Sequence, residues 1–345
     1  MQIKTEWMTA RVAAVEALTP TVRQIDLALA NRHFPFAPGS HIDVVTFIDG
    51  RAQTRSYSLL PPPRPGTMRI AVKLLAAGRG GSAFMGRLRP GAQLTVSAPD
   101  NRFPLSQATE APLLVAGGIG ITPMLGMARQ LAAQGRAFRF LYAGRSRPDM
   151  AYLPQIQAIC GERLAVFAGE EGRRLDLGAA IAGLDPAAEL YLCGPLRMLE
   201  DARRLWAEAG RPAHALRTEI FGDSGHFAPE PFEVFAVQEG RGTTVGVHET
   251  IATALGRIGV AVLTDCERGE CGLCAVKVTA YDGRIDHRDV FFSEAEKAGN
   301  ARLCACVSRV VGGAGGRGRV SIDTGFRRSA AAATDGADSA AASGL

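Results

Sequence analysis

The chain has 345 residues, 47% of them hydrophobic, and a formal net charge of +5. This length allows two or three domains, each with enough apolar residues for a core. The mild charge, with no basic cluster interleaved with aromatic residues, argues against nucleic acid as a partner. No run approaches the ~20 apolar residues of a membrane span, and the first residues form no signal peptide. With seven cysteines, we expect a cytoplasmic protein that carries a metal site.

The first third of the chain consists of short runs of alternating apolar and polar residues. Proline and glycine separate these runs, as at Pro35, Pro38 and Gly39. The pattern predicts a small antiparallel β-barrel. Strands are predicted at Val12–Glu16, Val22–Leu29, His41–Phe47 and Met68–Leu75.

Two motifs in this region could hold an aromatic cofactor that carries phosphate. Arg55–Leu59 reads Arg-Ser-Tyr-Ser-Leu, in which a tyrosine ring can lie on a cofactor, hydroxyls can bond to it and arginine can pair with phosphate. Gly78–Ser82 reads Gly-Arg-Gly-Gly-Ser at a predicted helix start, where backbone N–H groups attract phosphate. Taken singly, these motifs are explained better by an ordinary strand and an ordinary turn, and they gain weight only together, about twenty residues apart in one predicted barrel.

The middle third begins with a predicted buried strand, Leu113–Ala116, followed by the glycine-rich turn Gly117–Met124. Thr122 is the predicted N-cap of the next helix, and Pro123 is its predicted first residue. A strand, a glycine turn and a helix N-terminus together form a pyrophosphate cradle. Pro123 replaces the third glycine of the Gly-x-Gly-x-x-Gly fingerprint, so an ordinary Rossmann dehydrogenase is disfavoured.

Two further predicted strands of this region also end in turns that could bind a ligand. Arg139–Tyr142 leads into Ala-Gly-Arg, ending at Arg145, and Leu190–Leu192 leads into Cys193-Gly194-Pro195, where a helix is predicted to begin. Strands that alternate with helices predict a parallel sheet with ligands at the carboxyl ends of the strands. Cys193 could equally be a small core residue, and Cys160 is expected to be structural.

The last third is expected to be a separate module behind a linker, Gly222–Pro231. Its pattern predicts two strands and a helix before a group of cysteines. The strands are Phe232–Gln238 and Thr243–Val247, with a turn at Glu239–Gly242, and the helix has its apolar face at Ile251, Ala254, Leu255 and Ile258 and ends at Gly259.

Three cysteines, Cys266, Cys271 and Cys274, have the Cys-x4-Cys-x2-Cys spacing of a plant-type [2Fe–2S] site. Gly269 and Gly272 would let the backbone pass close to the cluster. A zinc site usually needs a second Cys-x2-Cys pair, which is missing, and a disulfide framework is disfavoured without a secretory signal. Spacing alone does not decide the fourth ligand, because 29 residues separate Cys274 from Cys304 and 31 residues separate it from Cys306.

The motifs Arg55–Leu59 and Gly78–Ser82, with the segment Pro99–Leu105, resemble the flavin domain of the ferredoxin–NADP reductase superfamily. The similarity is greatest to the phthalate dioxygenase reductase group, which includes vanillate demethylase reductases, and it covers the chain except its tail. It implies three domains: a β-barrel, an α/β parallel-sheet domain and a β-grasp ferredoxin domain. The implied boundaries are 1–108, 109–226 and 227–326, and 327–345 is expected to be a disordered tail.

The resemblance implies FMN, NADH and a [2Fe–2S] cluster as cofactors. It places Cys193 beside the nicotinamide and Phe221 on the flavin, although Phe221 could be a plain core residue. NADH is favoured, although Arg147 could raise affinity for a 2′-phosphate. The implied cofactor-binding residues are Arg55, Ser56, Tyr57, Ser58, Ala71, Val72, Lys73, Gly80, Gly81, Ser82, Gly117, Gly118, Gly120, Thr122, Pro123, Arg145, Gly194 and Pro195.

The resemblance also favours Cys306 as the fourth cluster ligand, because Cys306–Arg309 reads Cys-Val-Ser-Arg as in that group. The extra length would then lie in a predicted hairpin at Ala280–Gly283, where insertions cost little. His287–Asp289 could face a partner, or could simply form a solvated turn. The expected metal ligands are therefore Cys266, Cys271, Cys274 and Cys306.

Together the three modules form an electron path from nicotinamide to flavin to cluster. A hydride carries two electrons and a [2Fe–2S] cluster accepts one, and a flavin can convert between them. The resemblance implies a monomeric reductase component of a two-component Rieske-type aromatic oxygenase or O-demethylase. The alternatives are a reductase for a cytochrome P450 or a diiron oxygenase, and a cluster-based redox sensor.

Overall fold

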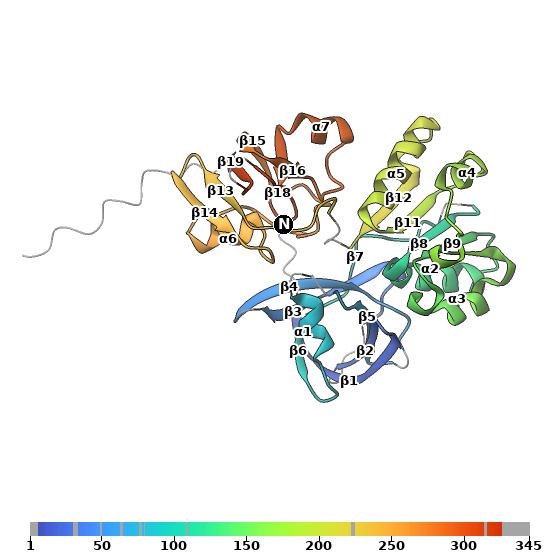
Figure 1. Cartoon of the computed structure of the whole chain (residues 1–345). Coiled ribbons are helices and arrows are strands. Elements are labelled where there is room, and N and C mark those ends of the chain that lie inside the picture. Colours follow the sequence, from blue (N-terminus) through green and yellow to red (C-terminus); the bar gives the residue numbers. More distant parts are fainter. Residues whose placement is uncertain are drawn as a thin grey trace, which may run out of the picture. The chain divides into compact units, whose positions relative to one another are not determined.

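The computed structural model describes residues 6–29, 34–48, 50–62, 65–75, 78, 80–107, 110–221, 225–313 and 316–325 (Figure 1). The chain forms two compact units, Met1–His226 and Phe227–Leu345, and each is described by itself. The predicted tail 327–345, the residue Arg79 and the first part of the predicted linker lie outside the described residues. No helix among the described residues is long and apolar enough to cross a membrane.

The first unit begins with a seven-stranded antiparallel sheet in the order β4-β3-β6-β1-β2-β5, with β7 paired to β3. The amide of Leu60, just after β4, donates to the Arg69 carbonyl of β5 (2.9 Å), which draws the two outer strands together as in a barrel. The four predicted strands are confirmed, and Val22–Leu29 coincides with β2. The elements are β1 (Trp7–Thr19), β2 (Val22–Leu29), β3 (Ser40–Ile48), β4 (Arg51–Ser58), β5 (Thr67–Lys73), α1 (Gly81–Gly86), β6 (Gln93–Ser97) and β7 (Asp100–Asn101).

A five-stranded parallel sheet in the order β10-β9-β8-β11-β12 follows, as predicted. Helices α2 and α3 pack together, as do α4 and α5 (Figure 1). Strands β8 and β11 are buried along their whole length, which explains their uninterrupted apolar sequences. The elements are β8 (Leu113–Gly117), α2 (Ile121–Ala133), β9 (Arg139–Gly144), α3 (Leu153–Cys160), β10 (Leu164–Ala168), α4 (Leu177–Ala182), β11 (Leu190–Gly194), α5 (Leu196–Glu208) and β12 (Leu216–Ile220), with short 3₁₀ turns η1 (Gly118–Gly120), η2 (Arg147–Asp149), η3 (Gly161–Arg163), η4 (Gly169–Glu171) and η5 (Ala213–Ala215).

The prediction that Thr122 caps α2 is wrong. The helix begins at Ile121 with Gly120 as its N-cap, and the Thr122 hydroxyl donates to the Ile119 carbonyl (3.0 Å). Pro123 is therefore the third helical residue. The 3₁₀ turn η1 leads directly into α2, so the helical winding starts earlier than a side-chain cap would place it.

The barrel and the parallel sheet of the first unit share one hydrophobic core. Val22, Leu60 and Ala71 of the barrel region pack with residues such as Leu114 and Ile121. A buried hydrogen bond runs from the Tyr152 hydroxyl to the Gln24 side-chain oxygen (2.9 Å). This packing joins the barrel and the parallel sheet into one unit.

The second unit contains a mixed five-stranded sheet in the order β14-β13-β19-β15-β17, with β16 and β18 as a separate pair. Helix α6 begins at Ile251, the first residue of the predicted apolar face. It is capped by the Thr250 hydroxyl, which accepts from the Thr253 amide (3.0 Å). Gly259 follows the helix in the left-handed region (φ 76°). The elements are β13 (Phe232–Ala236), β14 (Arg241–Val245), α6 (Ile251–Arg257), β15 (Ala275–Asp282), β16 (Arg284–Asp286), α7 (Glu294–Gly299), β17 (Arg302–Cys304), β18 (Arg309–Val311) and β19 (Arg319–Asp323).

Three local predictions in this unit are wrong. The turn after β13 spans Val237–Gly240, not Glu239–Gly242, because β13 is shorter than predicted. Ala280–Gly283 is not a hairpin, since β15 and β16 pair in different sheets and the chain changes sheet at Gly283 (φ 106°). His287–Asp289 is buried rather than solvated: His287 Nε2 bonds with Asn300, Arg288 Nε donates to Asp286, and Asp289 Oδ2 accepts from the Phe292 amide.

Candidate functional site

Arg55 on β4 lies beside the start of helix α1. A Cβ added to Gly81 would lie 2.8 Å from Arg55 Nε, so only glycine leaves room for this side chain. The guanidinium is held by bonds from Nη1 to the Thr54 carbonyl (2.7 Å) and from Nη2 to Gln53 Oε1 (2.7 Å). Gly80, at φ 83°, precedes the helix. A fixed cation beside backbone N–H groups suits a phosphate.

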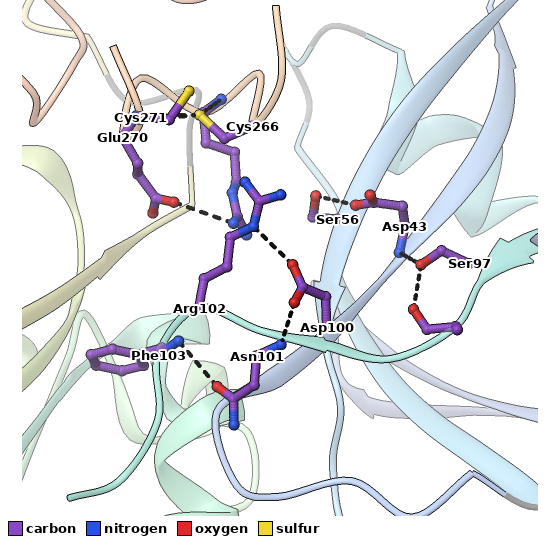
Figure 2. A network of polar contacts seen from close by, with 12 residues as sticks. Asp43, Ser56, Ser97, Asp100, Asn101, Arg102, Phe103, Cys266, Glu270 and Cys271 are labelled. Carbon is purple, nitrogen blue, oxygen red and sulfur yellow. Dashed lines mark hydrogen bonds and ion pairs between the residues drawn. The ribbon is translucent and has the colours of Figure 1, made fainter. Parts of the chain in front are cut away.

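The two serines of β4 differ in their partners. Figure 2 shows Ser56 Oγ donating to Asp43 Oδ1 (2.5 Å), and the Asp43 amide donating to Ser97 Oγ (2.9 Å). Ser58 is buried, and its hydroxyl has no hydrogen-bond partner among the described residues. A buried unpaired hydroxyl is costly, so Ser58 is the better placed of the two to bond a ligand. Tyr57, between them, packs against the barrel core.

The segment Pro99–Leu105 is anchored by its own polar side chains (Figure 2). Asp100 pairs with Arg102 Nε (2.8 Å), and Asn101 accepts from the Phe103 amide (3.1 Å). Burial raises the pKa of Asp100, but the hydrogen bond from Arg102 and the charge of His41 bring the pKa below its usual value. A Cβ on Gly39 would lie 1.9 Å from the Phe103 carbonyl oxygen, so the chain can pass here only at glycine.

The middle of the first unit brings barrel and nucleotide-domain residues together. Ala71 and Val72 on β5 are buried, and Lys73 at its end is exposed. A Cβ on Gly118 would lie 4.0 Å from Lys73 Nζ. Gly118 also has φ 56°, a conformation that L residues rarely adopt. The end of β5 therefore lies beside the glycine turn.

The same turn lies against the carboxyl end of β11 and the proline that follows it. A Cβ on Gly120 would lie 2.0 Å from the Cys193 carbonyl oxygen, and one on Gly117 would lie 2.7 Å from Pro195 Cδ and 3.1 Å from the Gly194 Cα. Strands β9 and β10 are added on one side of β8, and β11 and β12 are added on its other side, so the strand order reverses between β8 and β11. Ligands of open parallel sheets bind at such switch points, outside the carboxyl ends of the strands.

One supporting residue of this turn was not identified from the sequence. The Tyr142 hydroxyl on β9 can bond the carbonyls of Ala151 (2.9 Å) and Gly118 (3.3 Å). Burial raises the pKa of Tyr142, so the hydroxyl stays a neutral donor. A tyrosine in a buried strand needs a partner for its hydroxyl, and this requirement could have identified Tyr142 from the sequence.

Cys193, Phe221 and Ala71 belong to one core region. Cys193 is fully buried, and Phe221 is partly buried against the cluster that contains Cys193 and Ala71. Glu219 is the strand partner of Cys193 and is also buried, which sequence reasoning did not single out. Cys160 lies in the core on α3, where burial raises its thiol pKa to about 11.

At the outer strands of the same sheet, Arg145 is exposed after β9, but Arg147 is engaged. The Arg147 guanidinium forms an ion pair with Glu171, which follows β10. This hydrogen bond raises the pKa of Arg147 and lowers that of Glu171. Arg145 and Arg147 therefore differ in their availability to a ligand.

In the second unit, the loop at Cys266 turns its amides toward sulfur. The N–H groups of Arg268, Glu270 and Cys271 each point at Cys266 Sγ (3.4 Å; Figure 2 shows Cys266 with Cys271). Gly272 (φ 73°) lies under the Phe291 ring, because a Cβ there would come within 2.2 Å of it. N–H groups directed at a cysteine sulfur stabilise a thiolate, which is the form that binds iron.

Two of the other thiols of this unit also meet. Cys274 Sγ and Cys306 Sγ lie 3.0 Å apart, and both side chains are buried. Hydrogen bonds from Cys304 and then Cys306 lower the pKa of Cys274. Within the described ranges, no group of three or more cysteine, histidine or acidic side chains converges in metal-binding geometry. The donor set, thiols with amides directed at sulfur, is nevertheless that of an iron–sulfur cluster.

Buried polar residues brace the cluster loop. Asp289 accepts from the Phe292 amide (2.9 Å), and a Cβ on Gly269 would lie 2.8 Å from the Asp289 Cα. Arg309 donates to the carbonyls of Glu230 (3.0 Å), Gly246 (2.8 Å) and Glu249 (2.8 Å). These residues hold the segments around the cysteines in place.

Comparison with known families matches three successive models. Residues 9–104 match an oxidoreductase FAD-binding domain, residues 114–204 an oxidoreductase NAD-binding domain and residues 236–311 a 2Fe-2S iron–sulfur cluster binding domain. The order of the three models is flavin, nucleotide and cluster.

Two similar proteins have names that describe reductases. A putative toluene-4-sulfonate monooxygenase system reductase subunit of Comamonas testosteroni is 36% identical over 314 residues, covering 88% of this chain and 96% of that protein. A vanillate O-demethylase oxidoreductase of Pseudomonas sp. (strain HR199) is 34% identical over 283 residues, covering 80% and 87%.

Two solved structures are also similar. A phthalate dioxygenase reductase, described as a modular structure for electron transfer from pyridine nucleotides to [2Fe–2S], is 29% identical. The match has a TM-score of 0.71 and covers 92% of this chain and 98% of that chain. An intact type IV self-sufficient cytochrome P450 monooxygenase is 33% identical with a TM-score of 0.63, over 92% of this chain but 41% of that chain.

Proposed function

This chain belongs to the phthalate dioxygenase reductase-like family of NAD(P)H-dependent flavin iron–sulfur oxidoreductases, and we propose that it is the NADH-dependent reductase component of a Rieske-type aromatic oxygenase or O-demethylase. It is a reductase subunit whose partner is the oxygenase subunit of a two-component system. Within the proposal, the reductase is a monomer, and its domains are 1–108, 109–226 and 227–326.

The observation that carries the proposal is the junction in the first unit. The turn Gly117–Gly120 lies on Cys193–Pro195 at the switch point of the parallel sheet, with Lys73 of the barrel beside Gly118. A nicotinamide coenzyme bound by its pyrophosphate at this turn would have its reactive ring near strand β5. A barrel flavin lying along β5 would then be within reach of the hydride.

The barrel residues fit a flavin with one phosphate. Arg55, with Gly80, Gly81 and Ser82, would hold the phosphate of FMN, since the cation and the helix start lie together. Tyr57 and Ser58 would contact the ring, Ser56 would support them through Asp43, and Ala71, Val72 and Lys73 would run beside it. A bound flavin supplies the conversion from a two-electron donor to a one-electron acceptor.

The nucleotide residues would bind and orient the coenzyme. The amides of Gly117, Gly118 and Gly120 lie at the start of α2, where they can hold pyrophosphate, and Thr122 and Pro123 form the first turn of that helix. Gly194 and Pro195 would close the other side, and Arg145, exposed after β9, would contact the adenosine end. Cys193 and Phe221 would contact the nicotinamide and flavin rings and exclude water from between them.

The second unit would carry the electrons out. Cys266, Cys271, Cys274 and Cys306 would hold the [2Fe–2S] cluster, with the amides around Cys266 bonding its sulfur. Plant-type clusters have potentials near roughly −400 mV, low enough to reduce an oxygenase centre. Cys271 is exposed, so one edge of the loop is open to an acceptor.

The test is an anaerobic titration of the purified protein with NADH, followed by absorption. Flavin bands and the cluster absorption to their red should both bleach, and acid should release FMN identifiable by chromatography. Cytochrome c should be reduced by NADH without any further protein. Release of FAD would overturn the FMN assignment, and a flavin that bleaches while the cluster does not would overturn the electron path.

A second candidate acceptor is a cytochrome P450, because almost the whole chain matches part of a self-sufficient P450 monooxygenase. Mixing the NADH-reduced protein with a purified Rieske-type oxygenase, and separately with a purified P450, separates the two. The proposal expects faster oxidation of the reductase by the Rieske centre, and faster oxidation by the P450 would favour the second candidate.

A further inference from the structure

The carboxyl ends of β9 and β10, beside the switch point, form a polar edge that the electron path does not use. Arg145, Ser146 and Arg147 follow β9. In sheets of this type, residues after the second strand contact the adenosine ribose, and an arginine there can accommodate the 2′-phosphate of NADPH. These residues therefore bear on which coenzyme the site accepts.

The donors of Ser146 and Arg147 are already given to carboxylates, whereas Arg145 is exposed. Ser146 Oγ donates to Asp149 Oδ2 (2.9 Å), and the Arg147 amide donates to Glu170 Oε1 (2.8 Å). The Arg147 guanidinium donates from Nε to Glu171 Oε1 and from Nη2 to Glu171 Oε2 (3.3 Å). A hydroxyl, an amide and a guanidinium that could bind a phosphate thus each have an acidic partner.

The backbone holds these carboxylates where they are. Glu170 and Glu171 lie in η4, directly after β10, and the Glu170 amide donates to the Arg145 carbonyl (2.9 Å). A Cβ on Gly169 would lie 3.3 Å from that same carbonyl oxygen, so the two strand ends approach closely. The acids are therefore part of the sheet edge and not of a remote loop.

The edge carries no excess of positive charge. In residues 145–149 and 169–176, the four arginines Arg145, Arg147, Arg173 and Arg174 are offset by the four carboxylates of Asp149, Glu170, Glu171 and Asp176. Arg173 lies over the Phe167 ring, 5.7 Å from its centre. A 2′-phosphate adds up to two negative charges, and here it would meet the carboxylates that hold Ser146 and Arg147.

We propose that this chain selects NADH over NADPH by occupying its own phosphate donors: Glu171 holds Arg147, while Asp149 and Glu170 hold Ser146 and the Arg147 amide. The inference rests on the proposed function, which places the coenzyme at this sheet. The carboxylates would weaken the binding of NADPH and would add no contact to NADH. Removing the Glu171 charge should convert Arg147 from a partner of Glu171 into a ligand for a 2′-phosphate.

The test compares kcat/KM for NADH and NADPH in the flavin- and cluster-loaded protein, with ferricyanide as acceptor. Glu171→Gln should raise the NADPH/NADH ratio about tenfold, the effect of one added charged contact to phosphate. Glu170→Gln with Glu171→Gln should raise it further. Arg147→Gln in the Glu171→Gln background should abolish the gain.

The matched control is Glu208→Gln, which breaks another exposed pair, Arg204 Nη1 with Glu208 Oε1 (3.1 Å), on α5 of the same sheet domain. It should leave the ratio unchanged. A second measurement, calorimetric binding of adenosine 2′,5′-bisphosphate and of 5′-AMP, should show tighter binding of the bisphosphate alone in Glu171→Gln.

The outcomes separate this inference from the function on which it rests. Two results would overturn the selection mechanism only. One is a wild-type NADPH/NADH ratio of kcat/KM near one. The other is a Glu171→Gln protein whose ratio and bisphosphate affinity both stay within about twofold of wild type. A loaded wild-type protein that oxidises neither coenzyme would overturn the proposed function, and the selection mechanism with it. If Glu171→Gln folds poorly, Glu171→Ala provides the same comparison.

Discussion

Gly120 and Cys193 lie in direct contact: a Cβ on Gly120 would come within 2.0 Å of the Cys193 carbonyl oxygen. The contact joins the turn after β8 to the carboxyl end of β11, two strands that are adjacent in the sheet and far apart in the sequence. No real Cβ contact is that short, so any other residue must displace backbone. The two halves of the proposed nucleotide site therefore depend on this glycine for their spacing.

Gly120→Ala should disrupt the proposed nucleotide site. We expect a loss of stability of about 1–3 kcal/mol, as for other overpacked sites, because the clash is with backbone that cannot rotate away. The rate of flavin reduction by NADH, measured by stopped flow, should fall at least about tenfold. Reduction of the flavin by dithionite should be retained.

Gly183→Ala is the control for this substitution. Its Cβ would lie 3.5 Å from the Ala179 carbonyl oxygen, an ordinary contact, and Gly183 has φ −85°. It should reduce flavin at the wild-type rate. Equal rates in Gly120→Ala and Gly183→Ala would contradict the role given to the contact between Gly120 and Cys193.

Arg55→Gln should weaken flavin binding. The variant removes the cation beside Gly81, and a hydrogen bond to a charged group contributes about 1.5–3 kcal/mol, which is about 10- to 100-fold in affinity. Titration of the apoprotein with FMN, followed by fluorescence quenching, measures the change. Arg89→Gln is the control, since Arg89 also donates to backbone carbonyls, those of Arg87 (3.3 Å) and Leu88 (2.9 Å). Unchanged FMN affinity in Arg55→Gln would remove Arg55 from the proposed phosphate site.

Cys306→Ser should lose or alter the iron–sulfur spectrum, and Cys304→Ser should keep it. The reason is that iron in these clusters prefers thiolate, and a serine oxygen is a poorer ligand. Visible absorption, iron content and the electron paramagnetic resonance signal of the reduced protein report the cluster directly. A full cluster in Cys306→Ser together with its loss in Cys304→Ser would reverse the assignment of the fourth ligand.

Cys160 should react slowly with thiol reagents in the folded protein. Burial raises its pKa to about 11, so at pH 8 only about one molecule in a thousand carries the reactive thiolate. Raising the pH increases the thiolate fraction, so the rate should grow about tenfold per pH unit until about pH 11. Peptide mass spectrometry after timed alkylation assigns the site, with guanidinium-unfolded protein as the control. A folded rate at pH 8 equal to the unfolded rate would show that Cys160 is not buried in solution.

The local chemistry of this protein could be predicted because it depends on spacing along the chain. Strand Val22–Leu29 follows from alternation, and the helix at Ile251 follows from its apolar period. The helix start at Thr122 was wrong by only a few residues, because a 3₁₀ turn and a capped helix have similar sequences.

Other features needed the tertiary structure, because they join residues with no sequence relationship. The buried state of His287–Asp289 depends on partners such as Asn300 and Phe292, and the change of sheet at Gly283 depends on which strands pair. The sequence by itself determined the order of the modules and the type of donor in each motif. Only the fold decided that Gly120 meets Cys193 and that Arg147 meets Glu171, since side chains become neighbours through packing and not through their position in the chain.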